Sequence, residues 1–138
     1  MHPDYPKSNR LSEEVIGAGI EVHRIMGPGL LESIYEKCLM RELELRELHA
    51  VQQQEVRIEY KDLVFTETLR FDILVEGCLL VEIKAVKSVL PIHQAQLLSY
   101  MKLLNVPLGL VMNFHDVRLI DGLSRMILRD AGEEEGEE

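Results

Sequence analysis

Tryptophan is absent from the 138 residues, aromatic side chains make up only 5% of them, and cysteine occurs twice. Cys38 and Cys78 lie far apart and have no cysteine or histidine neighbour at the spacing of zinc ligands. Neither a zinc site nor a disulfide framework follows from such a pattern. We expect both residues to be reduced and to act as small hydrophobic side chains.

Two further patterns are missing. The chain does not open with the basic, apolar and small-residue segments of a secretory signal, and no apolar run approaches the length that spans a bilayer. We therefore expect a cytoplasmic protein without a membrane partner.

Positive charge is scarce, because 15 Lys and Arg face 24 Asp and Glu and give a formal net charge of -9. Glutamates of the C-terminal tail supply five of these charges, which leaves -4 for the rest of the chain. A negative chain gains little long-range attraction to nucleic acid, so any phosphate-binding surface must be local. This argues against a non-specific DNA coat protein, and less against an enzyme whose metal ion supplies the positive charge.

The length fits a single domain with one core. Residues 1–10 contain two prolines and mixed polar side chains and are predicted to be a loose leader. Residues 11–130 form the predicted domain, and residues 131–138 are predicted to be a disordered acidic tail.

The spacing of apolar residues predicts helices and strands in a definite order. Helices are expected from Ser12, as the N-cap, to Met26, from Leu30 to Leu48, and from Pro91 to Leu104. Strands are expected at Val51–Tyr60, Leu63–Phe65, in a hairpin over Leu69–Ala85, at Leu108–Phe114 and at Ser124–Leu128 after an Asp121-Gly122 turn. This order predicts an α/β fold with a mixed central sheet flanked by helices. A right-handed crossover would make the strands containing Glu82 and Leu108 parallel.

Three charged residues interrupt the apolar hairpin: Asp72, Glu82 and Lys84. Side chains alternate between the faces of a strand, so Glu82 and Lys84 project from the same face. A two-residue loop at Glu76-Gly77 would place Asp72 on the opposite face. We therefore predict an odd-numbered loop or a β-bulge, either of which Gly77 favours by tolerating positive φ.

Two carboxylates beside a lysine suit a hard divalent cation such as Mg²⁺, with Mn²⁺ as a substitute. A bound metal can polarise a phosphoryl oxygen and lower the pKa of a water. Lys84 could deprotonate or orient the attacking water, or neutralise charge on the phosphate, and the sequence leaves these roles open. Glu82 and Lys84 could also be an ordinary ion pair on an exposed strand.

Other polar residues have a comparable choice of roles. His93, Gln96 and Tyr100 share one face of the third predicted helix, which could meet a phosphate or be a half-exposed amphipathic face. Glu32 could be a third carboxylate turned toward the metal or a glutamate placed to interact with the helix dipole. His23 fits a core or helix-end histidine better than a ligand.

These residues carry a resemblance to a known family. The segment Gly29-Leu-Leu-Glu32-Ser-Ile-Tyr35 resembles the signature of the GxxExxY proteins, a branch of the PD-(D/E)XK nuclease superfamily. Similar motifs are Gly27-Pro28-Gly29, Phe71-Asp72, Val81-Glu82-Ile83-Lys84-Ala85 and His93-Gln-Ala-Gln96-Leu-Leu-Ser-Tyr100, and the likeness spans Leu11 to Leu128. Phe71 stands where the superfamily name has proline.

The resemblance implies a restriction-endonuclease-like core and a metal-dependent phosphodiester hydrolase that acts on DNA. It makes Asp72, Glu82 and Glu32 metal ligands and Lys84 the catalytic lysine. It adds Gln96 to the catalytic residues, and Tyr35, His93 and Tyr100 to those that position substrate. Small relatives in this superfamily are often dimers, so a homodimer is compatible with it.

The alternative is a module that keeps the nuclease fold and binds nucleic acid or protein without turnover. The low positive charge favours it, because a nuclease usually shows a clearer basic stripe. Four cationic residues could form such a stripe: Arg24, Lys87, Lys102 and Arg118. Their clustering around Glu82 would favour the enzyme, and their scattering would favour the binding module.

Overall fold

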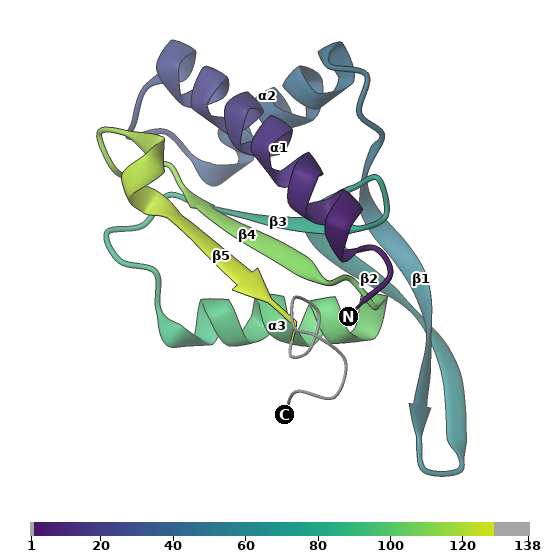
Figure 1. Cartoon of the computed structure of the whole chain (residues 1–138). Coiled ribbons are helices and arrows are strands. Elements are labelled where there is room, and N and C mark those ends of the chain that lie inside the picture. Colours follow the sequence, from purple (N-terminus) through teal and green to yellow (C-terminus); the bar gives the residue numbers. More distant parts are fainter. Residues whose placement is uncertain (1, 129–138) are drawn as a thin grey trace.

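The computed structural model describes residues 2–128, which form a five-stranded mixed sheet with helices on both faces (Figure 1). Its helices are α1 (Tyr5–Met26), α2 (Glu32–Leu45), α3 (Pro91–Leu104) and the 3₁₀ turn η1 (Leu119–Gly122). Its strands are β1 (Ala50–Tyr60), β2 (Leu63–Val75), β3 (Leu79–Lys84), β4 (Leu108–Asn113) and β5 (Leu123–Ile127), and they lie in this order across the sheet. Only β3 and β4 pair in parallel, as the crossover through α3 predicts.

The N-terminal prediction was wrong. Helix α1 begins at Tyr5, within the segment expected to be a loose leader, and Ser12 lies inside the helix rather than at its N-cap. Pro6 is compatible with the first helical turn, where its missing N–H is not needed. Tertiary contacts hold this turn in place, because the buried Ser8 Oγ donates a hydrogen bond of 2.7 Å to the carbonyl of Cys78.

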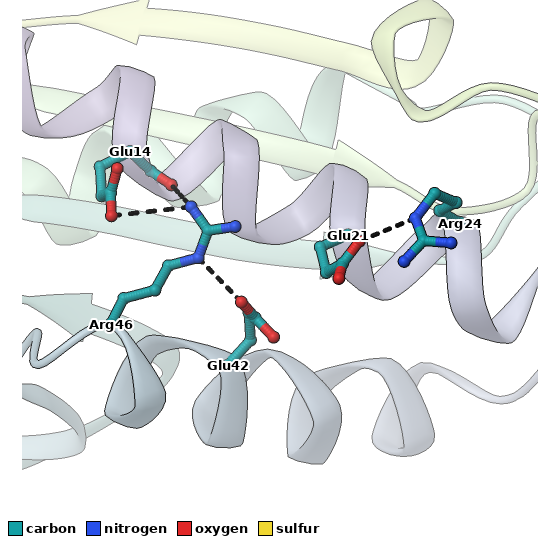
Figure 2. Close-up of polar contacts among 5 residues, drawn as sticks. All are labelled: Glu14, Glu21, Arg24, Glu42 and Arg46. Carbon is teal, nitrogen blue, oxygen red and sulfur yellow. Dashed lines mark hydrogen bonds and ion pairs between the residues drawn. The ribbon is translucent and has the colours of Figure 1, made fainter.

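Helices α1 and α2 cover one face of the sheet and form the larger core with it (Figure 1). Both helices contribute fully buried apolar side chains: Val15, Ala18, Tyr35, Leu39 and Leu43. Arg46 adds a polar connection at the end of α2, where its Nε lies 2.8 Å from Glu42 and its Nη1 lies 3.6 Å from Glu14 of α1 (Figure 2). These ion pairs are partly exposed, so apolar packing dominates the association of the two helices.

Helix α3 covers the opposite face alone and forms a second, smaller core (Figure 1). Leu97 and Met101 pack there against Leu74, Leu80 and Val111 of the sheet. The two faces are separated by strand alternation, since Leu80 faces α3 whereas its neighbours Leu79 and Val81 belong to the larger core. Glu82 and Lys84 share the parity of Leu80 and therefore belong to the α3 side.

The loop between β2 and β3 has three residues, as the predicted position of Asp72 requires. Val75 pairs with Leu79, and the loop between them is Glu76, Gly77 and Cys78. Gly77 has a φ of 67° and Glu76 a φ of 51°, so both occupy the left-handed region. The prediction of an odd-numbered loop is confirmed, and its register places Asp72 and Glu82 at facing positions of the two strands.

Strands β1 and β2 continue beyond the core as a projecting hairpin, which we call the arm and define as residues 53–70 (Figure 1). Its register is regular from Gln53↔Arg70 to Tyr60↔Leu63, and most of its side chains are exposed. The sequence predicts the two strands and the Lys61-Asp62 turn. It does not show that they leave the body of the domain.

Smaller differences concern the ends of elements. Helix α2 spans Glu32–Leu45 rather than Leu30–Leu48, and the predicted Asp121-Gly122 turn lies in η1. Cys38 and Cys78 are free thiols, as expected. The predicted acidic tail at residues 131–138 lies outside the described residues. Among the helices of residues 2–128, none is long and apolar enough to cross a bilayer.

Tyr35 forms hydrogen bonds with the backbone of the turn between α1 and α2. Its hydroxyl donates a hydrogen bond of 2.6 Å to the carbonyl of Gly27 and accepts one of 3.0 Å from the N–H of Leu30. Its ring is fully buried and stacks on Phe114 with 4.3 Å between the ring centroids. Tyr35 therefore stabilises the fold, and its hydroxyl is already engaged by the backbone.

We predict that Tyr35→Phe lowers the free energy of unfolding by about 1–3 kcal/mol, because the substitution leaves two backbone groups unpaired while preserving the stacked ring. Urea denaturation followed by circular dichroism measures this change. Tyr60→Phe is the matched control at an exposed position and should change stability by less than about 0.5 kcal/mol. Equal stability of the two variants would contradict the structural role.

Candidate active site

Asp72 lies where strand β2 stops pairing with β3. The pairing of β1 with β2 shifts between Val51 and Gln53, and the last residue of β2 paired to β3 on this side is Ile73. Asp72 Oδ2 then accepts a hydrogen bond of 2.7 Å from the N–H of Ile83. A side-chain carboxylate thus takes the place of a main-chain acceptor, which fixes it beside β3.

Glu82 and Lys84 project from the same face of β3, but of the two only Glu82 lines the pocket beside α3. Lys84 Nζ lies 3.7 Å from Glu82 Oε1, and the two side chains are only 17% and 16% exposed. Glu82 Oε2 is buried and has no hydrogen-bond partner among the described residues. A buried carboxylate oxygen without a partner is costly, so this atom is suited to a cation or a water.

A small pocket of about 100 Å³ opens over these carboxylates. Its lining includes Asp72 and Glu82 from the sheet, and Gln96 and Tyr100 from α3. Arg70, at the base of the arm, also lines it. The pocket has room for an ion with several waters. Of the three polar residues predicted to share one face of α3, Gln96 and Tyr100 therefore line the same pocket as the carboxylates.

His93, the third residue of that face, is absent from the pocket lining. Its Nδ1 lies 3.1 Å from the N–H of Leu90 and satisfies a donor at the start of α3. His23 is buried, and its Nε2 lies 2.8 Å from the carbonyl of Asp116, which fits the expected core or helix-end role.

Glu32 approaches the end of β3 from the other side of the sheet. Its Oε2 accepts a hydrogen bond of 3.1 Å from the N–H of Ala85. Ile83 and Ala85 donate to Asp72 and Glu32 respectively, and two residues along a strand span about 6.6 Å. Glu32 is therefore held just beyond the C-terminal end of β3, at Ala85, and does not line the pocket.

Burial raises the pKa of both Asp72 and Glu82. Burial is the main cause of the raised pKa of Asp72, which the hydrogen bond from Ile83 and the charge of Lys84 partly oppose. Burial also raises the pKa of Glu82, with Lys84 acting against it and Asp72 adding to it. Glu32 contributes repulsion to both. The site is therefore short of positive charge.

Glu36, one turn after Glu32 on α2, belongs to the same electrostatic environment. Burial and the charges of Asp72 and Glu32 raise the pKa of Glu36, while a hydrogen bond from Gln52 lowers it. The Gln52 Nε2 to Glu36 Oε1 distance is 2.7 Å. The i,i+4 spacing from Glu32 is the sequence signal that could have identified Glu36.

The cationic residues proposed for a basic stripe do not line the pocket. Arg24 pairs with Glu21 (Figure 2) and Arg118 pairs with Asp121. Lys87 borders a different hollow, and Lys102 lies in the last turn of α3. Arg70 is the guanidinium that lines the pocket, and sequence reasoning missed it because a charged residue in an exposed strand gives no distinct signal.

The arrangement of oxygen, nitrogen and sulfur donors limits which residues could bind a metal ion. Across residues 2–128, no three His, Cys, Asp or Glu side chains are arranged to hold one metal ion together. Asp72 and Glu82 nevertheless fit a hard cation, because both line the pocket and Glu82 has a buried oxygen without a partner.

A mixed sheet between helices, with Asp72, Glu82 and Lys84 on adjoining strands, defines a restriction-endonuclease-like fold. The family model of the PD-(D/E)XK nuclease superfamily matches residues 9–126. The chain therefore belongs to this superfamily, whose nucleases typically use divalent metals. Comparisons with curated proteins and with solved structures gave no significant match.

We predict that Glu82→Gln stabilises the metal-free protein at neutral pH. A pKa raised on folding gives stability that is present below the unfolded pKa and lost as pH rises through the folded pKa. The wild type therefore loses stability as Glu82 ionises, whereas glutamine does not titrate. Thermal melts in chelator across the acid-to-neutral range should show a Tm gain that is smallest in acid.

Glu13→Gln, on the exposed side of α1, is the control and should alter the free energy of unfolding by less than about 0.5 kcal/mol. A Glu82→Gln variant that is less stable than the wild type at neutral pH would show that the Lys84 pair outweighs burial.

Proposed function

We propose that this protein is a Mg²⁺-dependent phosphodiesterase that cleaves DNA by attack of water at phosphorus. Within the superfamily we assign it to the GxxExxY branch, on the motif from Gly29 to Tyr35. The observation that carries the proposal is the pair Asp72 and Glu82 in one pocket, with a buried carboxylate oxygen lacking a partner and a lysine ammonium 3.7 Å from the other oxygen.

Asp72 and Glu82 would hold the cation. Glu32 would reach the cation through a water, because its carboxylate is bound at Ala85, beyond the end of β3. The hydrogen bonds from Ile83 and Ala85 each engage one carboxylate oxygen, which leaves the second oxygen of Asp72 and Glu32 for this purpose. When bound, Mg²⁺, or Mn²⁺ in its place, would supply Lewis acidity and offset the repulsion between these carboxylates.

The remaining groups act on the substrate. Lys84, beside Glu82, places positive charge where the phosphate becomes more negative during attack. Gln96 and Tyr100 line the pocket from α3 and can donate hydrogen bonds to phosphate oxygens. Arg70 lines it from the base of the arm and can form a bidentate contact with a phosphate. The pocket contacts proposed here involve the DNA backbone and carry no sequence information directly.

A binding module without turnover remains the second candidate. The observation that favours it is the position of Arg24, Lys87, Lys102 and Arg118, none of which lines the pocket. Such a module would bind DNA through Arg70 and a bound cation, and substitution of Lys84 would leave no chemical step to impair.

The direct test is cleavage of single-stranded, duplex and branched DNA in the presence of Mg²⁺ or Mn²⁺. We expect cleavage that a chelator abolishes, and a rate lowered by about 10²–10³-fold in Lys84→Ala, because one preorganised charge is lost from the transition state. Asp72→Asn should lower the cleavage rate further than Lys84→Ala does, since it removes a carboxylate proposed to bind the cation.

Lys87→Ala removes an exposed lysine that borders a different hollow and should cleave DNA like the wild type. Binding of the same DNAs is measured in parallel. Binding without cleavage of any DNA by the wild type would favour the module, and cleavage unaffected by Lys84→Ala would remove the lysine from the mechanism.

A further inference from the structure

The arm has two chemically different faces. Its register sets Ile58 opposite Phe65 and Tyr60 opposite Leu63, so one face of this two-stranded ribbon is apolar toward its tip. Tyr60 is 63% exposed and Leu63 is 54% exposed. The other face carries Glu55, Arg57 and Glu59 on β1, which are exposed as well. A two-stranded ribbon of this kind is marginal in water without a further partner.

The outer edge of β1 is open to such a partner, because β1 is the first strand of the sheet and no strand within residues 2–128 pairs with it on that side. Its arm half contains no proline, and the register shift lies at its base between Val51 and Gln53 rather than along the exposed edge. Proline and a bulge are two of the devices that block an edge strand, and charged side chains are a third, which this edge does carry. The opposite edge, β5, has five residues, and Arg125 on it bonds to Ser12 of α1 at 3.1 Å.

The backbone groups that face this open edge follow from the turn. A two-residue turn closes on a hydrogen-bonded pair, here Tyr60 and Leu63, and hydrogen-bonded pairs then alternate along the ribbon. The N–H and C=O of Ile58 therefore point toward β2. Those of Arg57 and Glu59 point outward and are free to pair with a further strand.

The charges along this edge alternate in sign: Glu55, Arg57, Glu59 and Lys61. Antiparallel pairing of two copies centred on Ile58 sets each Arg57 opposite the partner's Glu59 and each Glu55 opposite the partner's Lys61. Centring the pairing on Arg57 or on Glu59 instead brings like charges together, which is destabilising. The alternation of charge therefore favours pairing centred on Ile58 over pairing centred on either adjacent residue.

Centring on Val56 would also join Glu55 to Arg57, but it would leave Glu59 opposite a glutamine. Arg57 and Glu59 already form an ion pair within one arm. The Ile58 register adds an opposite charge from the partner to each of the four residues, and on the other face Val56 lies opposite the partner's Tyr60. It also agrees with the backbone, because Arg57 and Glu59 form the hydrogen-bonded pairs and Ile58 the non-hydrogen-bonded one.

We propose that a second copy of this chain binds the outer edge of β1, through antiparallel pairing of residues 55–61 centred on Ile58. The contact is isologous and closes after two copies. It joins the two arms at their tips, so the bodies of the two domains do not approach each other. The seam is short, and the dimer therefore depends on protein concentration.

The same arm is a poor surface for nucleic acid, because it carries four anionic and three cationic side chains. Those charges are Glu55, Glu59, Asp62 and Glu67 against Arg57, Lys61 and Arg70. Their alternation complements a second copy and offers no basic stripe to phosphates.

Charge reversal tests the register, with sedimentation equilibrium as the measurement. The wild type should approach twice its 15.9 kDa mass as concentration rises. Arg57→Glu places like charges opposite each other twice per dimer and should raise the dissociation constant at least about tenfold. Arg57→Glu combined with Glu59→Arg restores opposite charges only in the Ile58 register, so it should restore the dimer.

A wild type that stays monomeric up to about 1 mM, where association is already very weak, would overturn the proposal. A dimer unaffected by Arg57→Glu would place the contact elsewhere and overturn it too. Failure of the double variant to restore dimerisation, with unchanged circular dichroism, would overturn the register.

Cross-linking provides an independent measurement. In a Cys38→Ser background, Ile58→Cys puts a thiol at the two-fold axis, where the same residue of both copies is closely opposed, and mild oxidation should give a covalent dimer. Gln54→Cys is the matched control on the same edge, away from the axis, and should not cross-link. Equal cross-linking of both variants, or none at position 58, contradicts the proposed seam.

Discussion

The site depends on the hydrogen bond from the Ile83 N–H to the Asp72 carboxylate, at the point where β2 stops pairing with β3. The three-residue loop sets the register that brings these two residues together. One residue more or less in that loop would turn Asp72 to the opposite face. Burial raises the pKa of Asp72 and of Glu82, the charge of Glu32 adds to both, and Lys84 offsets this only partly. A cation would complete the balance of charge.

The sequence alone allowed the site-bearing part of the fold to be predicted. Because side chains alternate between the faces of a strand, Asp72 and Glu82 can share a face only if the loop has an odd number of residues. The loop has three. The crossover through α3 required the strand of Glu82 to run parallel to β4, as it does. Helical spacing placed Gln96 and Tyr100 on one face, and both line the pocket. These predictions depend on short-range geometry, which a sequence specifies well.

What could not be predicted depends on tertiary contacts. The start of α1 at Tyr5 is supported by Ser8, whose partner is a carbonyl 70 residues away. Glu36 is half-buried and accepts a hydrogen bond from Gln52, a strand residue 16 positions further along the chain. Tyr35 has the pattern of a functional tyrosine, but its hydroxyl bonds to the backbone of a neighbouring turn. The projection of the arm was also hidden, because Val56, Ile58 and the residues around them alternate like those of an ordinary half-buried strand.

The central claim is that Asp72 and Glu82 share one divalent cation in the pocket beneath α3. A crystal structure of the protein soaked with Mn²⁺, recorded at a wavelength where manganese scatters anomalously, tests it most directly. We predict an anomalous peak within about 2.0–2.4 Å of one oxygen from each carboxylate, the range of hard cations with oxygen ligands. A well-ordered pocket without such a peak, or a peak bound only by other residues, would contradict the account.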